Sequence, residues 1–276
     1  MHDDILLGKE TQYVFHYDKS LIFPIARSGN REKLTMPNKR VSDDLPFYGQ
    51  DIWTAFELSW LNMKGKPQVA IAEFIIPANS KSIVESKSFK LYLNSFNQTK
   101  LNGIEELQNT LTQDLSEGFG AEITVKLFAV NDYPLGISNI GKNIDDLDIE
   151  VIDYEPNAQL LAVEGDSRAE ETINSHLLKS NCPVTGQPDW ATVVVSYKGV
   201  KINHAAFLKY IISYRNHDDF HEHCVEQIFC DLQNIGEFEA LTVTARYTRR
   251  GGLDINPTRS LKAVNSNACI QRLARQ

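Results

Sequence analysis

The feature that most constrains this chain of 276 residues is an internal repeat. The stretch GKPQVA (65–70) aligns with GQPDWA (186–191), and in the same register Ser59 aligns with Ser180. After a gap of three residues, FKLYLNSF (89–96) aligns with FLKYIISY (207–214), with matching Phe, Tyr and Ser. A repeat this long indicates two homologous halves rather than a solenoid, whose repeating units are shorter.

Hydrophobic periodicity predicts the same order of elements in each half. The predicted strands are 51–61, 67–77 and 121–130 in the first half, and 171–181, 190–200 and 238–248 in the second. The predicted helices are 84–96, 104–115, 203–214 and 220–232. The first fifty residues are rich in turn signals and are predicted to form an irregular arm, and the acidic stretch 141–157 a linker. We therefore predict an α+β fold with two domains, 1–140 and 141–276.

Composition excludes several classes of protein. The chain is 42% hydrophobic and 23% charged, which is typical of a globular protein, and its net charge of −8 argues against a surface that coats nucleic acid. No apolar run is long enough for a membrane span, and the N-terminus has no signal-peptide pattern. The four cysteines show no paired spacing, which fits a reducing compartment. We expect a cytoplasmic protein that binds neither membrane nor nucleic acid.

The two halves differ at polar positions. The aligned pairs are Cys182 with Leu61, Asp189 with Gln68, Asn203 with Glu85, and Ala205 with Lys87. Each half has therefore kept one set of polar groups. If both sets serve one site, that site is expected between the halves or between subunits.

The stretch SNCPVTGQPDW (180–190) places Cys182 before a turn and Asp189 after it. A thiolate is a nucleophile, and it forms near neutral pH only beside a cation, a helix N-terminus or a base. A carboxyl group across the turn could exchange a proton with a group bound to sulfur. On spacing alone, a buried cysteine at a strand end is the commoner structure, since free cysteines are usually buried.

The stretch HDDFHEHCVEQIFC (217–230) holds a second group of candidates. His217, His221 and Cys224 are spaced so that a helix could present them to zinc, but HExxH is absent because Val225 stands where its second histidine would be. A solvated helix start is the commoner explanation. A third possibility is that His221 and Glu222 bind a ligand, because a carboxylate accepts two adjacent N–H donors of a guanine-like ring.

Two basic stretches remain. VESKSFKLY (84–92) alternates Glu and Lys, which is usual for an exposed helix face. YTRRGGLDINPTRS (247–260) combines arginines, including Arg259, with a Gly-Gly pair, a combination suited to phosphate but also to a plain turn. No GxGxxG follows a strand, so a dinucleotide would not be bound by a Rossmann unit.

Taken together, these motifs resemble a known family. SNCPVTGQPDW, ESKSFKLY, HDDFHEHC, RRGGLDINP and the N-terminal YDKSLIFPIARSGNR are similar to the two-module form of 7-cyano-7-deazaguanine reductase, the NADPH-dependent nitrile reductase of queuosine biosynthesis for tRNA. The resemblance implies two tandem tunnelling-fold (T-fold) modules. Each would be an antiparallel four-stranded sheet with two helices on one face, assembling as a homodimer. The fourth strand of each half is not located from the sequence.

The resemblance also implies a reaction. Cys182 would attack the nitrile carbon of 7-cyano-7-deazaguanine to give a thioimide, with Asp189 as proton donor. Two NADPH would then reduce it to 7-aminomethyl-7-deazaguanine. A protonated thioimide accepts hydride more readily than a nitrile, so covalent catalysis divides one difficult step into easier ones.

The resemblance assigns further residues. Substrate would be bound by Val84, Glu85, Ser86, His221 and Glu222. NADPH would be bound by Ser86, Lys87, Arg250 and Gly251, and no metal is expected. We also hypothesise a reversible, protective disulfide between Cys182 and Cys224 under oxidation.

Two alternatives stay open on the residues alone. One is a tunnelling-fold zinc hydrolase of the cyclohydrolase type, supported only by His217, His221 and Cys224. The other is a non-catalytic purine- or pterin-binding module in which Cys182 is simply buried.

Overall fold

The computed structural model describes residues 14–36, 39–40, 45–134, 140–264, 272–273 and 276. The chain divides into two compact units, the first made of residues 1–28, 51–135 and 249–255, and the second of 29–50, 136–248 and 256–276. Each unit thus includes a short segment from the other half of the sequence. The boundary predicted between residues 140 and 141 stays a prediction.

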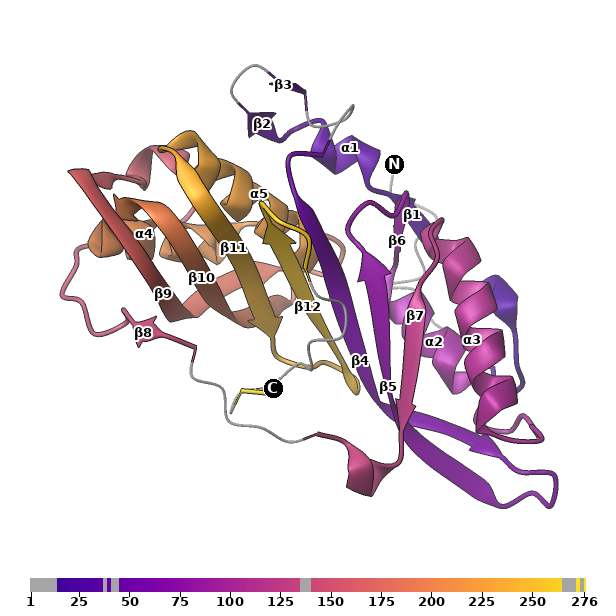
Figure 1. Ribbon diagram of the computed structural model, residues 1–276. Coiled ribbons are helices and arrows are strands. Elements are labelled where there is room, and N and C mark those ends of the chain that lie inside the picture. The colour runs from indigo at the N-terminus through magenta and orange to yellow at the C-terminus, as the bar shows by residue number, and fades with distance from the viewer. Residues whose placement is uncertain (1–13, 37–38, 41–44, 135–139, 265–271, 274–275) are drawn as a thin grey trace. The chain divides into compact units, whose positions relative to one another are not determined.

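The first unit is built on three neighbouring strands in the order β7–β5–β4, with bounds Thr124–Phe128, Pro67–Pro77 and Tyr48–Leu61. Helices α2 (Ser86–Asn94) and α3 (Ile104–Phe119) cover one face of these strands (Figure 1). The short elements of this unit are η1 (Lys19–Leu21), β1 (Pro24–Ala26), β6 (Ser82–Val84) and η2 (Val130–Asp132). Strands β1 and β6 pair antiparallel, which fixes part of the N-terminal arm to the sequence just before α2.

Aromatic side chains fill the space between helices and sheet in this unit. The ring of Trp53 on β4 lies 4.9 Å from that of Phe89 on α2 and 5.6 Å from that of Phe119 on α3. Phe74 on β5 meets Phe89 edge to face, at 5.0 Å and 89°. Such edge contacts add specific geometry to the burial of large apolar surfaces. The helices therefore cannot shift along the sheet without breaking several ring contacts.

The second unit has strands in the order β12–β11–β10–β9–β8, with bounds Leu253–Ser260, Phe238–Tyr247, Pro188–Ile202, Val163–Asn181 and Lys142–Asn143. Strand β12 belongs to this unit from residue 256 onward. Strands β9 to β12 are antiparallel, and β8 joins β9 in parallel. Helices α4 (His204–Ser213) and α5 (His221–Asn234) lie against one face of this sheet (Figure 1). The short elements are α1 (Ser28–Arg31), β2 (Thr35–Met36), β3 (Lys39–Arg40), η3 (Ala158–Leu160) and η4 (Tyr214–Asn216).

The α+β class is confirmed, and each predicted helix and strand has a counterpart. Three differences have physical causes. Residues 82–84 form a strand, so Val84 precedes α2, because Glu85 caps the helix. Strand β9 begins at Val163, since polar residues extend it beyond the apolar pattern. Strand β12 was not predicted, because LDINPTRS contains a proline and polar side chains that turn out to be buried. In the described part of the chain, no helix is both long and apolar enough to span a bilayer.

The structure supports the internal repeat in its packing. The hydroxyl of Tyr92 on α2 donates to Asp114 on α3 at 2.8 Å, and that of Tyr210 on α4 donates to Asp231 on α5 at 2.6 Å. The first helix of each pair is also capped in the same way. The side chain of Glu85 accepts from backbone N–H groups of α2, and that of Asn203 from a backbone N–H of α4. Glu85 and Asn203 are therefore equivalent, as the sequence alignment predicted.

Candidate active site

Cys182 lies at the base of the loop that joins β9 to β10. Its N–H donates to the carbonyl of Gln187 at 2.9 Å, and its carbonyl accepts from the N–H of Gly186, also at 2.9 Å. Gly186 has φ of +65°, a conformation that glycine adopts without strain. Cys182 is a free thiol and is 7% exposed. Both of its backbone groups are thus held, and the loop fixes where the side chain starts.

The corresponding loop of the first unit corrects one part of the sequence alignment. There the N–H of Asn62 donates to the carbonyl of Lys66, so three residues separate the paired positions, whereas four separate Cys182 from Gln187. The structural counterpart of Cys182 is therefore Asn62, and the predicted match with Leu61 is wrong by one residue. The cause is the extra residue in the second loop.

In the ladder between β10 and β9, Asp189 pairs with Ser180. Ser180 precedes Cys182 by two residues in the sequence. Cys182 and Asp189 therefore lie at the same end of the same pair of strands, as the turn between them predicted. Asp189 is 5% exposed, and its Oδ2 lies 3.1 Å from Nε2 of His221. The structure thus adds a histidine to the predicted acid.

His221 is the first residue of α5, and its ring stacks on Tyr247 with 3.8 Å between ring centroids and 19° between planes. Glu222 follows it and is 2% exposed. Cys224, one turn along the helix, is fully buried, and burial raises the pKa of its thiol well above the ordinary value. A buried neutral thiol is a poor nucleophile. Of the two thiols, Cys182 at the loop is the better placed for chemistry.

The segment just before α5 ties this helix to the end of β9. Asn181 exchanges backbone hydrogen bonds with His217 and Asp219, at 2.8 and 3.1 Å. Asp219 in turn lies 3.2 Å from Nδ1 of His223 and 3.6 Å from Nε2 of His217. Burial acts to raise the pKa of the Asp219 carboxyl, but these two histidine contacts outweigh it and hold the pKa well below its usual range. The residue before Cys182 is thereby fixed to the start of α5.

This arrangement separates the residues of the zinc alternative. His221 faces Asp189 and His217 faces Asp219, while Cys224 is buried under the sheet. Within the part of the chain that the structure describes, no three His, Cys, Asp or Glu side chains form a group that could hold a metal. The three residues named for the zinc alternative thus face different partners rather than one common point.

The first unit holds the second set of predicted residues. Glu85 is 2% exposed, and its carboxylate accepts from the N–H groups of Lys87 and Ser88 at 2.9 and 2.7 Å. Ser86 and Lys87 are the first two residues of α2. Val84 has its side chain in the hydrophobic core. The ESKSFK motif is thus a helix start whose acid is held in place by backbone donors.

The RRGG motif forms a tight turn in the same unit. Arg250 and Leu253 exchange backbone hydrogen bonds, and Gly251 and Gly252 have φ of +55° and +70°. Two consecutive positive φ angles are typical of a type I′ turn, which explains the Gly-Gly pair. A Cβ on Gly251 would lie 3.5 to 3.6 Å from the end of the Lys90 side chain, and both residues line one small cavity. Two motifs separated by more than half the sequence, ESKSFK and RRGG, therefore meet within this unit.

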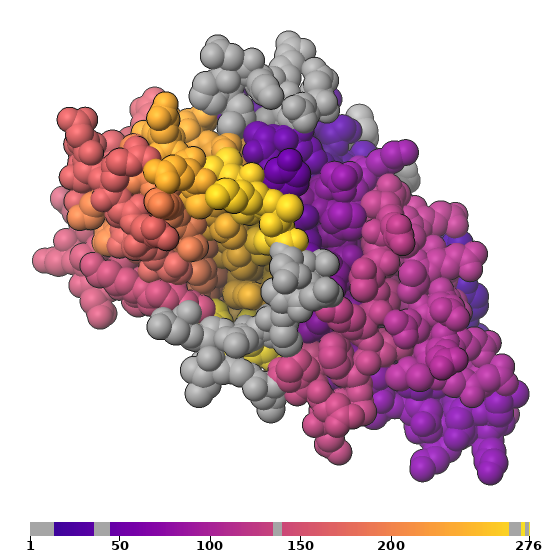
Figure 2. Space-filling view, in the orientation of Figure 1, coloured from indigo at the N-terminus to yellow at the C-terminus, as the bar shows by residue number. Residues whose placement is uncertain are grey.

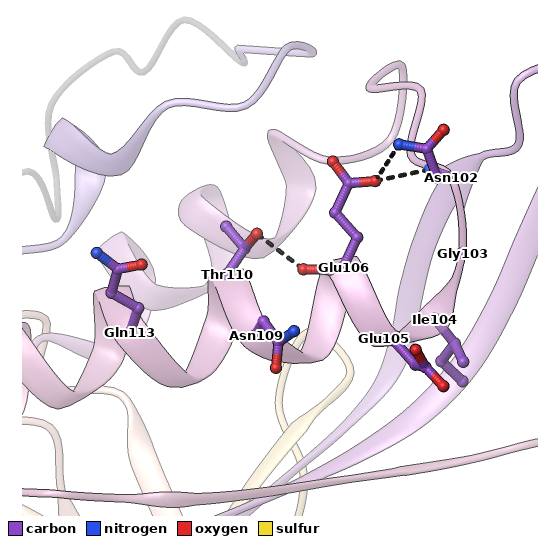
Figure 3. Close-up of a pocket in the computed structure, with 8 residues that line it drawn as sticks. All are labelled: Asn102, Gly103, Ile104, Glu105, Glu106, Asn109, Thr110 and Gln113. Carbon is purple, nitrogen blue, oxygen red and sulfur yellow. Dashed lines mark hydrogen bonds between the residues drawn. The ribbon is translucent and has the colours of Figure 1, made fainter.

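The first unit also keeps a pocket at the place equivalent to the cysteine site. It is lined by Asn62, Gln68, Ile104 and Ala129 among others, the counterparts of Cys182, Asp189, His221 and Tyr247. A wider hollow beside it follows the first turns of α3 (Figure 3), where Glu106 accepts two hydrogen bonds from Asn102, at 2.7 and 2.8 Å. Neither pocket contains a thiol or a carboxylate–histidine pair.

Comparison with known proteins gives the family. Residues 13–127 match the family model described as nitrile reductase, 7-cyano-7-deazaguanine-reductase N-term, and residues 188–266 match the one described as QueF-like protein. The chain belongs to the 7-cyano-7-deazaguanine reductase family. It is 53% identical to the NADPH-dependent 7-cyano-7-deazaguanine reductase of Bordetella avium over 99% of this chain and 98% of that protein. The reductase of the same name from Chromohalobacter salexigens is 52% identical, over 98% and 96%.

Within this family fold, sequence reasoning missed a buried ion cluster under α5. Glu226 is fully buried, and its Oε1 lies 2.7 Å from Nη2 of Arg31 and 2.8 Å from Nη2 of Arg259. Burial acts to raise the pKa of Glu226, but the two guanidinium groups outweigh it and hold the pKa well below its usual range. The sequence predicts phosphate recognition for Arg259 from its place near RRGG, and the full burial of Arg259 against Glu226 corrects that prediction.

Two further points concern signals in the sequence. Tyr247 ends the strand before RRGG, and its aromatic ring in an otherwise polar YTRR run was a signal that could have been used. Glu226 lies four residues after Glu222 on the same helix, and like charges at that spacing repel each other. This spacing was a signal that one of the two carboxylates has a cationic partner. The Cys182–Cys224 disulfide stays a prediction, since both residues are free thiols here.

Proposed function

We propose that this protein reduces the nitrile of 7-cyano-7-deazaguanine to the primary amine of 7-aminomethyl-7-deazaguanine, with NADPH as reductant, in the route to queuosine in tRNA. Relatives at more than 50% identity over nearly the whole chain carry that activity in their name. The observation that carries the proposal within this chain is the fixed loop that holds Cys182 beside Asp189, with His221 on the carboxylate.

In the proposed mechanism, the S–H bond of Cys182 breaks and its proton is released as the sulfur bonds to the nitrile carbon, while a proton passes from Asp189 to the nitrile nitrogen. The carbon–nitrogen triple bond becomes the double bond of a thioimide. A hydride from NADPH would add to that carbon, and the carbon–sulfur bond would then break, with the sulfur taking up a proton to return the thiol. The imine left behind would take up a second hydride and a proton to give the amine. The pair of strands fixes sulfur and carboxylate at one end of a ladder, so little orientational freedom remains to be lost on the way to reaction.

His221 has a defined place in this proposal. Its Nε2 lies 3.1 Å from Asp189, so it can return a proton to the carboxylate or hold one oxygen in position. Together with Glu222, it is also proposed to bind the deazaguanine ring. Val84, Glu85 and Ser86 of the first unit complete the proposed substrate-binding set.

The first unit has groups suited to a dinucleotide phosphate. Lys87 and Lys90 stand one turn apart on α2, and the turn with Arg250 and Gly251 lies against Lys90. Cationic side chains beside glycine backbone are the usual donors to phosphate outside Rossmann folds. We assign NADPH binding to Ser86, Lys87, Arg250 and Gly251 on this basis. Three finer points are part of the same proposal: two tandem T-fold modules, a homodimer, and a cytoplasmic location.

The test is to mix the purified protein with 7-cyano-7-deazaguanine, with and without NADPH. With NADPH, two molecules should be oxidised for each amine formed. Without it, peptide mass spectrometry should find the intact nitrile added to Cys182. Oxidation of NADPH with no adduct on Cys182 in any condition would overturn the mechanism, and ligand binding with neither reaction would favour the non-catalytic module.

A further inference from the structure

Tyr247 is the last residue of β11, and only 1% of it is exposed. Its ring lies face to face with that of His221, at 3.8 Å between centroids and 19° between planes. Another buried tyrosine of the same sheet, Tyr197, meets Phe238 edge-on at 86°. A face-to-face contact keeps the imidazole plane close to parallel with the tyrosine ring, whereas an edge contact sets the two planes near a right angle.

The strand register places this ring next to the proposed acid. Tyr247 pairs with Ala191 in the ladder between β11 and β10, and Ala191 is two residues from Asp189. Residues two apart on a strand share a face, so Tyr247 and Asp189 lie on the same side of the sheet. The tyrosine ring therefore packs against one face of the His221 imidazole, while Nε2 of that imidazole lies 3.1 Å from Oδ2 of Asp189.

The hydroxyl of Tyr247 has a different environment from its ring. It is buried in the neighbourhood of Ser180 and Cys224, and burial raises the pKa of Tyr247 well above its usual value. A phenol so placed stays protonated at neutral pH. What Tyr247 offers His221 is the face of its ring.

The first half of the chain serves as an internal control. Ile71 pairs with Phe128 in the first half, and its equivalent Thr192 pairs with Arg246 in the second half. Phe128 and Arg246 are therefore equivalent, and so are the residues that follow them in the chain. These residues are Ala129 in the first half and Tyr247 in the second. The first half has Ile104 in place of His221 and Gln68 in place of Asp189. The tyrosine ring thus occurs in the half that has the histidine and the acid.

We propose that Tyr247 is a positioning residue of the nitrile reductase reaction: its ring holds the imidazole of His221 in the plane that directs Nε2 at Asp189. This rests on the proposed function for its effect on turnover, but the orientation of the imidazole can be measured without turnover. The ring is the part required, and the hydroxyl is dispensable.

The test compares Tyr247→Phe, which keeps the ring, with Tyr247→Leu and Tyr247→Met, which fill the space without one. Tyr197→Leu is the matched control, because it removes a buried tyrosine from the same face of the sheet away from His221. We expect Tyr247→Phe and Tyr197→Leu to keep kcat within about threefold. The ring-free variants should lower kcat by about 10- to 100-fold, the size expected for a displaced catalytic group.

The second readout is the NMR signal of the His221 ring, assigned by its absence in His221→Gln. A stacked ring shifts the imidazole C–H protons upfield, so the signal should move downfield in Tyr247→Leu and Tyr247→Met and stay in place in Tyr247→Phe and Tyr197→Leu. Wild-type kcat or an unmoved signal in a folded ring-free variant would overturn the proposal. If the wild type oxidises no NADPH, the proposed function fails, while the NMR signal still decides whether Tyr247 orients His221.

Discussion

Helices α3 and α5 begin at corresponding points of the two halves, yet their first turns have opposite surroundings. Ile104, Glu105 and Asn109 on α3 are exposed, and Figure 2 shows the stretch from α3 to β7 as a broad magenta surface. On α5, Glu222 is 2% exposed and Glu226 is fully buried. In the second unit, Arg31 and Phe47 cover this side of the helix. The same helix position is therefore a solvated surface in one half and a polar interior in the other.

What the halves share lies deeper in the helix pairs. Tyr92 with Asp114 and Tyr210 with Asp231 are the same buried contact made twice. The second hydroxyl near each acid has a different source, however. In the first unit it is that of Tyr17 from the N-terminal arm, at 2.7 Å from Asp114, and in the second it is that of Tyr214, which bonds to Tyr210. The core of the repeat has stayed constant while the ends of the helices and sheet changed.

The largest effect should come from the two loops. Cys182→Ala should abolish measurable nitrile reduction and leave the melting temperature nearly unchanged, because the backbone bonds of the loop remain. Asn62→Ala, at the equivalent position, should do the reverse. It should keep activity and cost about 1 kcal/mol, since Asn62 accepts from the N–H groups of Lys64 and Lys66. Activity and thermal unfolding measured on both variants check this, and loss of activity in Asn62→Ala would contradict the division of labour.

The buried ion cluster should give the largest effect on stability. Glu226→Gln leaves Arg31 and Arg259 without their shared carboxylate and should cost about 3–5 kcal/mol at neutral pH. Asn109→Ala, at the exposed equivalent in the first half, should change stability by less than about 0.5 kcal/mol. Urea unfolding of both variants measures the difference.

The pH dependence of this cluster has a definite sign. The pKa of Glu226 is lowered in the folded protein, so its carboxylate stabilises the fold above the unfolded pKa of about 4.3 and loses that contribution as pH falls below it. The stability gap between wild type and Glu226→Gln should therefore narrow as the pH is lowered from about 5. A gap that stays constant down to acid unfolding would contradict the ion-pair account.

Asp189→Asn should lower kcat by about 100- to 1,000-fold, because an amide cannot give its proton to the nitrile nitrogen. The change keeps the shape of the side chain beside His221, so folding should be preserved. Gln68→Ala, at the equivalent position of the first half, should leave kcat within about twofold, since no chemistry is assigned there. Steady-state NADPH oxidation compares the two, and a fully active Asp189→Asn would remove Asp189 from the mechanism.

The smallest expected effect is a difference in stability loss between the helix pair α2–α3 and the helix pair α4–α5. Tyr210→Phe and Tyr92→Phe each remove a hydroxyl from a buried carboxylate and should cost about 1–3 kcal/mol. We expect the larger loss for Tyr210→Phe, because Asp114 keeps Tyr17 and Lys19 as partners while Asp231 keeps Gln227. Thermal unfolding of the two variants gives the order, and a larger loss for Tyr92→Phe would contradict it.

The sequence predicted the framework well because hydrophobic period and turn residues are local signals. The loop with Cys182 and Asp189, and the two helix pairs, follow from such signals. The contact of Tyr247 with His221 and the burial of Glu226 were not predicted, and Arg259 was predicted for phosphate instead of for Glu226, since these roles depend on partners on other elements of the fold. Likewise, the exact match of Cys182 could not be found from aligned letters, because the identity of Ser59 with Ser180 supported a register before the loop that is wrong by one residue.

The extra residue of the loop with Cys182 also sets a rule for anyone who would build a second reactive centre into the first half. Writing Cys, Asp and His at Asn62, Gln68 and Ile104 would change the letters but not the length of the loop. In the short loop, the side chain of Asn62 accepts hydrogen bonds from the N–H groups of Lys64 and Lys66. In the longer loop, the side chain of Thr185 accepts from the N–H of Gln187 instead. An insertion would have to come before, or together with, the substitutions, so the route from one half to the other passes through a change of chain length.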